Sequence, residues 1–167
     1  QRYNDTRHNV GALLIHHLAA THNITLSYNK KLKGNVGKLS LNGNNTYLFI
    51  PETYMNESGQ AVLAIAHFYN IPPEQILVAH DELDFPTGKI RIKCGGGHGG
   101  HNGLRDTINK ISSRDFYRIR IGINHPGDQG EVSNYVLSKP KQAEKEEIIE
   151  SIEKSTQAIE LLTQAEF

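Results

Sequence analysis

The chain has a single cysteine, Cys94, among its 167 residues. One thiol can neither close an internal disulfide nor build a zinc site that needs several cysteines. Long apolar runs are also missing, so we expect no segment that crosses a membrane. The sequence, which begins at Gln1, shows no basic stretch followed by an apolar one, so no secretory signal is visible. These absences favour a cytoplasmic protein.

The sequence also lacks a net charge, since 18 basic side chains balance 18 acidic ones. The charges are nevertheless unevenly distributed. Residues 141–167 hold three lysines and seven glutamates, whereas residues 89–120 hold eight basic and two acidic side chains. A positive region beside a glycine-rich stretch favours an anionic ligand. From charge alone, a solvated basic surface balanced by an acidic tail is the more frequent case.

The hydrophobic pattern predicts alternating helices and strands. Apolar residues at helical spacing predict helices at 9–22, 58–69, 101–111 and 141–164. Short apolar or alternating runs predict strands at 35–41, 46–51, 76–79, 89–93 and 116–123. The dipeptide Asn42-Gly43 predicts a hairpin turn between the first two strands. Because no linker, repeat or low-complexity segment is present, we expect one α/β domain, residues 1–167, built around a mixed sheet.

Residues 93–106 read KCGGGHGGHNGLRD, and six of the ten positions that end at Gly103 are glycine. Gly95, Gly97 and Gly100 formally match the G-x-G-x-x-G pattern of dinucleotide-binding folds. The match is weak because the preceding strand is charged at alternate positions, whereas the first strand of such a fold is apolar. A P-loop lysine followed by Ser or Thr is missing. The glycines would still let backbone N–H groups approach an anionic ligand closely.

Several possible metal ligands occur, namely His80, Asp81, Asp84, His98 and His101. Nothing in the glycine-rich sequence holds the last two on a common face, so we expect no metal site. Asp81 follows a buried run, at the strand end where α/β sheets bind ligands. A carboxylate there can orient a histidine ring, although a cap or turn explains it equally well.

Asn9, Asn56 and Asn102 each lie near the beginning of a predicted helix. An amide side chain can donate and accept a hydrogen bond at once, so it suits an ester or amide substrate without adding charge. Asparagine is also a common helix-capping residue, and each of the three could have that role alone.

Five segments together resemble the bacterial peptidyl-tRNA hydrolases: TRHN (6–9), PETYMNESG (51–59), VAHDELDFPTG (78–88), GGGHGGHNGL (95–104) and RIRIGINHPG (118–127). They occur in the family's order and span nearly the whole chain. The resemblance implies one α/β domain with a twisted mixed sheet sandwiched between helices. It also implies hydrolysis of the ester between a peptide and the 3′ end of tRNA, which recycles tRNA from aborted translation, with no metal and no cofactor.

The resemblance further implies roles for individual residues. His8 matches the catalytic base, Asp81 the carboxylate that orients it, and Asn102 the amide that places the attacking water. Asn56 matches the amide that binds the peptide main chain, and Met55 lines the same site. Cys94 has no implied role.

Other residues are implied to contact the substrate. Tyr3, Asn9 and His101 border the same cleft, and Lys93 and Arg120 match the basic pair that grips the 5′-phosphate of tRNA. We therefore expect an RNA partner for a monomer that binds neither metal nor membrane. Family members begin with an apolar strand ending in Asn-Pro-Gly, and we expect the printed sequence, rather than the protein, to lack it.

Two other functions stay open on the residues alone. The basic strands would also suit a non-catalytic RNA-binding module, but they carry no exposed aromatic pairs for stacking on bases. The glycine pattern would suit a nucleotide-dependent enzyme.

Overall fold

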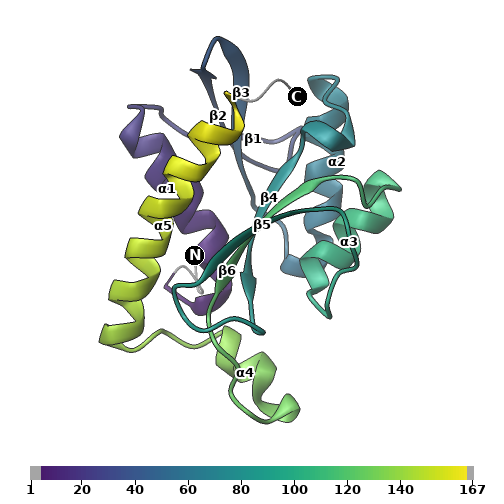
Figure 1. Ribbon diagram of the computed structural model, residues 1–167. Coiled ribbons are helices and arrows are strands. Elements are labelled where there is room, and N and C mark those ends of the chain that lie inside the picture. The colour runs from purple at the N-terminus through teal and green to yellow at the C-terminus, as the bar shows by residue number, and fades with distance from the viewer. Residues whose placement is uncertain (1–4, 165–167) are drawn as a thin grey trace. The chain divides into compact units, whose positions relative to one another are not determined.

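The computed structural model describes residues 5–164, and Figure 1 shows the helices and strands that they form. Contacts within the chain divide it into two compact units. Unit 1 contains residues 5–18, 78–93 and 118–164, and unit 2 contains residues 19–77 and 94–117.

Unit 1 contains a three-stranded sheet with the order β4-β6-β5. Its strands are β4 (Leu77–Glu82), β5 (Ile90–Cys94) and β6 (Tyr117–Gly122). Its helices are the 3-10 turn η1 (Arg7–Asn9), α1 (Val10–Thr21), the 3-10 turn η4 (Gln129–Glu131), α4 (Val132–Val136) and α5 (Gln142–Leu162). The last three residues of α1 and one end residue of each strand belong to unit 2.

Backbone hydrogen bonds show that β4 and β6 run parallel. The N–H of Tyr117 donates to the carbonyl of Ile76 at 2.9 Å, and the N–H of Ile123 donates to the carbonyl of Glu82 at 3.0 Å. Both partners therefore advance along the chain in the same direction.

The third strand, β5, runs antiparallel to β6. The N–H of Gly122 donates to the carbonyl of Lys89 at 2.8 Å, and the N–H of Gly95 donates to the carbonyl of Phe116 at 3.0 Å. The sheet is thus mixed, as predicted. The antiparallel direction also excludes a dinucleotide-binding unit here, because that unit needs parallel strands on either side of its helix.

Unit 2 contains an antiparallel sheet with the order β1-β2-β3. Its strands are β1 (Ser27–Asn29), β2 (Gly34–Leu41) and β3 (Asn44–Pro51). Its helices are α2 (Ser58–Phe68), α3 (Asn102–Ile111) and the 3-10 turns η2 (Met55–Glu57) and η3 (Pro73–Gln75). Asn42 and Gly43 form the predicted hairpin turn, with positive φ angles of 51° and 84°.

Each unit buries apolar side chains from several elements. In unit 1 the buried set includes Val10, Leu14, Leu18, Ile119, Ile121, Ile148, Ile152 and Ile159. In unit 2 it includes Leu32, Leu39, Leu48, Ala61, Ile65, Leu104 and Phe116. The longest helix, α5, has 21 residues, and four glutamates and two lysines are exposed on it. None of the helices formed by residues 5–164 could span a bilayer.

The exposure of β5 and of Arg118 differs from the prediction. One wet face was expected for β5, but Arg91, Ile92, Lys93 and Cys94 are all exposed. β5 is an edge strand of the sheet, with β6 as its one neighbour in the order β4-β6-β5. Arg118, which was counted in the basic region, is instead buried, with 3% of its surface exposed. The shortest elements, β1 and α4, were missed because three and five residues are too few to show a period.

A buried arginine fixes the short turn η1. The side chain of Arg7 is 6% exposed, and its Nη2 donates to Glu144 Oε2 at 2.7 Å. Its Nη1 donates to Ser138 Oγ at 2.6 Å and to the carbonyl of Lys139 at 3.0 Å. The guanidinium also lies 4.2 Å from the centre of the Tyr135 ring. These contacts hold η1 against the segment that leads into α5.

Helix α1 lies directly against β4 at Gly11. A Cβ added to Gly11 would overlap the carbonyl of Ala79. Both atoms belong to backbones within regular elements, so no side-chain rotation can relieve the overlap.

We expect Gly11→Ala to lower the free energy of unfolding by about 1–3 kcal/mol, because the overpacking outweighs the helix propensity that alanine gains. Urea unfolding of both proteins measures the difference. Gly97→Ala is the control, since no atom lies within 4 Å of its added Cβ. A Gly11→Ala protein as stable as the control would contradict the close contact.

A pH dependence follows from the Arg7–Glu144 pair. Burial raises the pKa of Glu144, but hydrogen bonds from the Lys141 backbone and from Arg7 outweigh it and hold the pKa below its ordinary value of 4.5. A carboxylate with a lowered pKa stabilises the fold above its unfolded pKa and loses that contribution as the pH falls through its folded pKa.

We therefore expect the unfolding free energy of the wild type to fall more steeply than that of Glu144→Gln as the pH drops below 4.5. Urea unfolding at a series of pH values measures both slopes. The control is Glu153→Gln, an exposed position on the same helix. Parallel curves for the wild type and Glu144→Gln would show that the pair does not stabilise the fold.

Candidate active site

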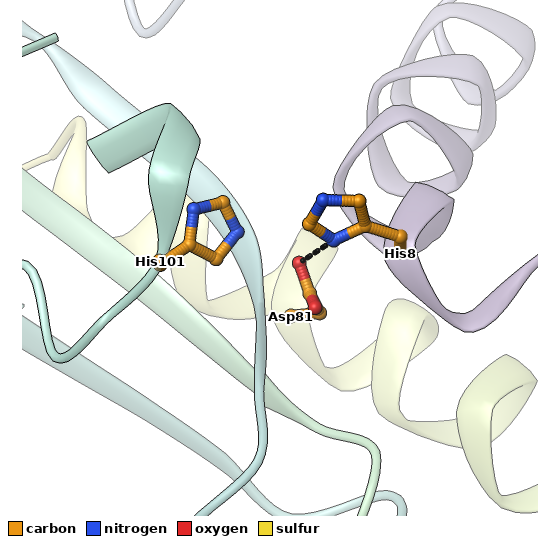
Figure 2. Close-up of side chains that lie close together, drawn as sticks. All are labelled: His8, Asp81 and His101. Atoms are coloured by element: carbon orange, nitrogen blue, oxygen red, sulfur yellow. Dashed lines mark hydrogen bonds and ion pairs between the residues drawn. The ribbon is translucent and has the colours of Figure 1, made fainter. Parts of the chain in front are cut away.

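The structure brings together two predicted site residues of unit 1 that lie 73 positions apart. His8 is the middle residue of η1, and Asp81 lies near the end of β4. His8 Nδ1 and Asp81 Oδ1 are 2.8 Å apart, and the dashed line in Figure 2 marks this hydrogen bond. The side chain of Asp81 is 4% exposed, whereas that of His8 is 19% exposed. The imidazole therefore meets solvent while its partner does not.

This hydrogen bond selects one tautomer of the ring. An ionised carboxylate can only accept, so His8 Nδ1 must carry the proton that it donates to Asp81. The lone pair of the neutral ring then lies on Nε2, which points away from the carboxylate as the other ring nitrogen. The pair can accept a proton at Nε2 and stabilise the resulting imidazolium.

The turn that presents His8 is closed by its own backbone. The N–H of Asn9 donates to the carbonyl of Thr6 at 3.0 Å, and Asn9 is half-buried. The side chain of Arg7, the residue before His8, takes part in the network described above. Tyr3, the other residue expected here, lies outside residues 5–164.

Two further predicted residues, Asn56 and Asn102, belong to unit 2. Asn56 lies in η2 and Asn102 is the first residue of α3, and both are exposed. Met55, which precedes Asn56 in η2, is half-buried. A Cβ added at Gly103 would be 2.7 Å from Met55 Sδ, so the methionine covers the beginning of α3. The two amides are thus presented by neighbouring turns.

An acidic residue that was not predicted joins the helices behind these amides. The N–H of Gly59, at the start of α2, donates to Asp106 Oδ2 of α3 at 2.8 Å. A Cβ at Gly59 would overlap the Asp106 backbone, so the two helices touch directly. A carboxylate at a helix N-terminus is favourable, because it satisfies an N–H that has no partner within the helix. The signal in the sequence was an acid at the end of the glycine-rich stretch 93–106.

His101 caps α3, which begins one residue later than predicted. Its Nδ1 accepts from the N–H of Leu104 at 3.2 Å, so the proton of the neutral ring lies on Nε2. His98 Nδ1 accepts similarly from the N–H of Gly100 at 3.0 Å. Among residues 5–164, no three potential metal ligands that belong to the same unit lie close enough together to hold one ion.

The predicted basic pair lies on the sheet of unit 1. Lys93 is exposed on β5, and Arg120 is partly exposed on β6. The Nε of Arg120 donates to Glu82 Oε2 at 2.8 Å. Glu82 was not predicted to have a role, although it belongs to the same segment as Asp81.

Comparison with known proteins identifies the relatives of this chain. The family model described as peptidyl-tRNA hydrolase matches residues 1–167. The peptidyl-tRNA hydrolase of Coxiella burnetii (strain RSA 493) is 53% identical over 166 residues, which cover 99% of this chain and 87% of that protein. The one from Histophilus somni is 51% identical over 162 residues, with 96% and 84% covered.

The comparison with solved structures identifies the same family as the comparison of sequences. The crystal structure of peptidyl-tRNA hydrolase from Acinetobacter baumannii has a TM-score of 0.94 to this chain at 45% identity, covering 98% of this chain and 83% of the other. A peptidyl-tRNA hydrolase crystallised with N-propanol gives a TM-score of 0.95 at the same identity and coverage. The chain therefore belongs to the peptidyl-tRNA hydrolase family.

Proposed function

We propose that this chain hydrolyses the ester between a peptide, or an N-blocked amino acid, and the 3′ end of tRNA, with His8 activating water and without a metal. Membership of the family makes the chain an enzyme that acts on peptidyl-tRNA. The observation that carries the choice of base is the 2.8 Å hydrogen bond between His8 and the buried Asp81.

The proton moves through His8 alone. Nε2 takes a proton from water while the oxygen of that water attacks the ester carbonyl carbon. Asp81 stays ionised and stabilises the imidazolium. When the tetrahedral intermediate collapses, the bond between the carbonyl carbon and the 3′ oxygen breaks, and Nε2 returns the proton to that oxygen. The products are a peptide carboxylate with its released proton and a tRNA with a free 3′ hydroxyl.

The two exposed amides of unit 2 would hold the attacking water and the peptide, which His8 does not bind. In this scheme Asn102 holds the attacking water, and Asn56 binds the peptide main chain next to the ester, with Met55, Asn9 and His101 bordering the substrate. A donor aimed at a developing oxyanion contributes about 2.7–4 kcal/mol in other hydrolases.

Positively charged side chains are sufficient to bind the tRNA part of the substrate. Lys93 and Arg120 would bind the 5′-phosphate, a contact that positions the tRNA without reading its sequence. We expect the enzyme to act as a monomer in the cytoplasm, because peptidyl-tRNA arises there during translation and each chain supplies every residue named above.

We expect His8→Ala to lower kcat for N-acetyl-aminoacyl-tRNA by about 10²–10⁴-fold, the usual contribution of a general base, while tRNA binding is retained. Asp81→Asn should also lower kcat, because the amide no longer holds the ring in one tautomer. Since the two act as a unit, the double variant should lose little more than His8→Ala alone. Single-turnover hydrolysis and a filter-binding assay measure the two effects.

The control is His16→Ala, an exposed histidine of α1, the helix that follows η1. It should leave kcat unchanged, and EDTA should leave the wild-type rate unchanged. Near-normal turnover by His8→Ala would overturn the assignment of the base, and loss of activity in EDTA would overturn the metal-free mechanism.

We expect the two asparagines to have separable effects. Asn102→Ala should lower kcat about 10²–10³-fold, as loss of one such donor does elsewhere, whereas Asn56→Ala should chiefly raise KM. Steady-state kinetics measure both, with Asn109→Ala as the control because it is exposed on the same helix as Asn102. Equal kcat values for Asn102→Ala and Asn109→Ala would exclude a role for Asn102 in placing the water.

A further inference from the structure

Tyr135 contacts two segments of unit 1, one leading to the proposed base and the other to its acid. It is a half-buried residue of α4. The guanidinium of Arg7 lies 4.2 Å from the centre of the Tyr135 ring, and the Tyr135 hydroxyl donates to the carbonyl of Ile123 at 2.6 Å. One side chain therefore contacts both the turn η1 and the residue that follows β6.

The hydroxyl of Tyr135 donates its proton to Ile123. That proton has two possible acceptors, the carbonyl of Ile123 at 2.6 Å and Glu144 Oε1 at 3.5 Å. Hydrogen bonds from a hydroxyl to an oxygen are about 2.5–3.0 Å long, so the carbonyl is the acceptor. Burial raises the pKa of Tyr135 above its ordinary value of 10.0, in spite of the Arg7 guanidinium beside it. The hydroxyl thus keeps this proton at neutral pH.

Ile123 connects Tyr135 to the strand end that carries Asp81. Ile123 is fully buried, and its N–H donates to the carbonyl of Glu82 at 3.0 Å. Glu82 directly follows Asp81 on β4. Because only two dihedral angles separate the N–H and the carbonyl of one residue, a shift of the Ile123 carbonyl would displace the backbone beside Asp81.

Arg7 connects the same tyrosine to the turn that carries His8. The backbone N–H of Arg7 donates to the carbonyl of Ser138 at 3.1 Å, and its Nη1 donates to Ser138 Oγ at 2.6 Å. Ser138 Oγ in turn donates to the carbonyl of Tyr135 at 2.7 Å. A 3-10 turn of three residues has few hydrogen bonds of its own, so these contacts determine where η1 holds the imidazole of His8.

These contacts form a closed circuit around the pair of proposed base and acid. Its members, in order, are His8, Arg7, Tyr135, Ile123, Glu82 and Asp81, and the 2.8 Å hydrogen bond between His8 and Asp81 closes it. A contact that served only to fix α4 could reach any part of the unit. Tyr135 instead reaches the backbones beside both members of the pair, so it constrains the distance between them.

We infer that Tyr135 is a positioning residue of the active site, which holds the backbones beside His8 and Asp81 at the separation that their hydrogen bond needs. This inference rests on the proposed function, because it concerns the geometry of the same base. The effect of Tyr135 on the reaction passes through the pair, and a misplacement of about 1 Å in an active site can lower a rate about 10²-fold.

Removal of the hydroxyl tests the inference. Tyr135→Phe keeps the ring beside Arg7 and removes only the donor to Ile123. We expect it to lower kcat for N-acetyl-aminoacyl-tRNA by about 10–10²-fold and to leave KM unchanged. Because the effect passes through the pair, Tyr135→Phe should lower kcat little further in an Asp81→Asn background. Ser138→Ala, which removes the hydroxyl between Arg7 and the carbonyl of Tyr135, should also lower kcat without changing KM.

Two controls separate positioning from stability. Tyr28→Phe removes a hydroxyl at an exposed position of β1 and should leave kcat and the melting temperature unchanged. Ile152→Val removes a buried methyl group from α5, so it should lower the melting temperature while kcat stays the same. A Tyr135→Phe protein that loses stability but keeps the kcat of Ile152→Val would show a structural contact only, and the inference would be wrong.

The state of the pair can also be measured without turnover. The proton on His8 Nδ1, hydrogen-bonded to Asp81, should give a downfield NMR resonance in the wild type that His8→Ala lacks. We expect this resonance to broaden or disappear in Tyr135→Phe, because a loosened hydrogen bond lets the proton exchange with water. It should persist in Tyr28→Phe.

The outcomes separate this inference from the proposed function. An equal loss of kcat from Tyr135→Phe in the wild-type and Asp81→Asn backgrounds, or no loss in either, would overturn the positioning role. Near-normal turnover by His8→Ala would overturn the proposed function instead. The NMR resonance of His8 would then decide the inference, since its loss in Tyr135→Phe would support the positioning contact and its persistence would overturn it.

Discussion

The hydrogen bond between His8 and Asp81 is the contact on which the chemistry of this chain depends. It joins a turn at one end of the sequence to a strand 73 residues away, and it fixes which ring nitrogen can accept a proton. A carboxylate as buried as Asp81 needs a partner, so the imidazole satisfies the acid as much as the acid orients the imidazole. The anchoring of Arg7 gives the turn little freedom to break this contact.

In unit 2, glycines that allow close packing, rather than a charge pair, set the positions of α2, α3 and Met55. Gly59 lets α2 touch the backbone of α3, and Gly103 makes room for Met55 beside Asn102. Gly99 and Gly100 have open space around them and positive φ values, so they shape the path of the loop and not its packing. The glycine-rich stretch therefore serves two purposes, a turn followed by a tightly packed helix start.

The sheet of unit 1 shows a conflict between stability and binding. Arg91 of β5 lies opposite Arg120 of β6, and the two charges repel each other. The ring of Phe85 and the carboxylate of Glu82 reduce that repulsion without removing the excess charge. Such a surface gains when a polyanion covers it. The buried Arg118 does not take part, which reduces the basic region that composition alone suggested.

The sequence by itself determined the longer helices and strands and the family, because helix and strand periods, the Asn42-Gly43 turn and the five motifs are all local patterns. It also indicated His8 and Asp81, although only through resemblance, since each alone could be a cap or a surface residue. The tertiary structure decided which contacts hold the elements that carry the candidate site residues: Arg7 of η1 with Glu144, Asp106 of α3 with Gly59, and Glu82 with Arg120. These partners lie 38 to 137 positions apart, and no local pattern encodes such a pairing, because it is fixed only when strand register and helix packing bring the backbones together.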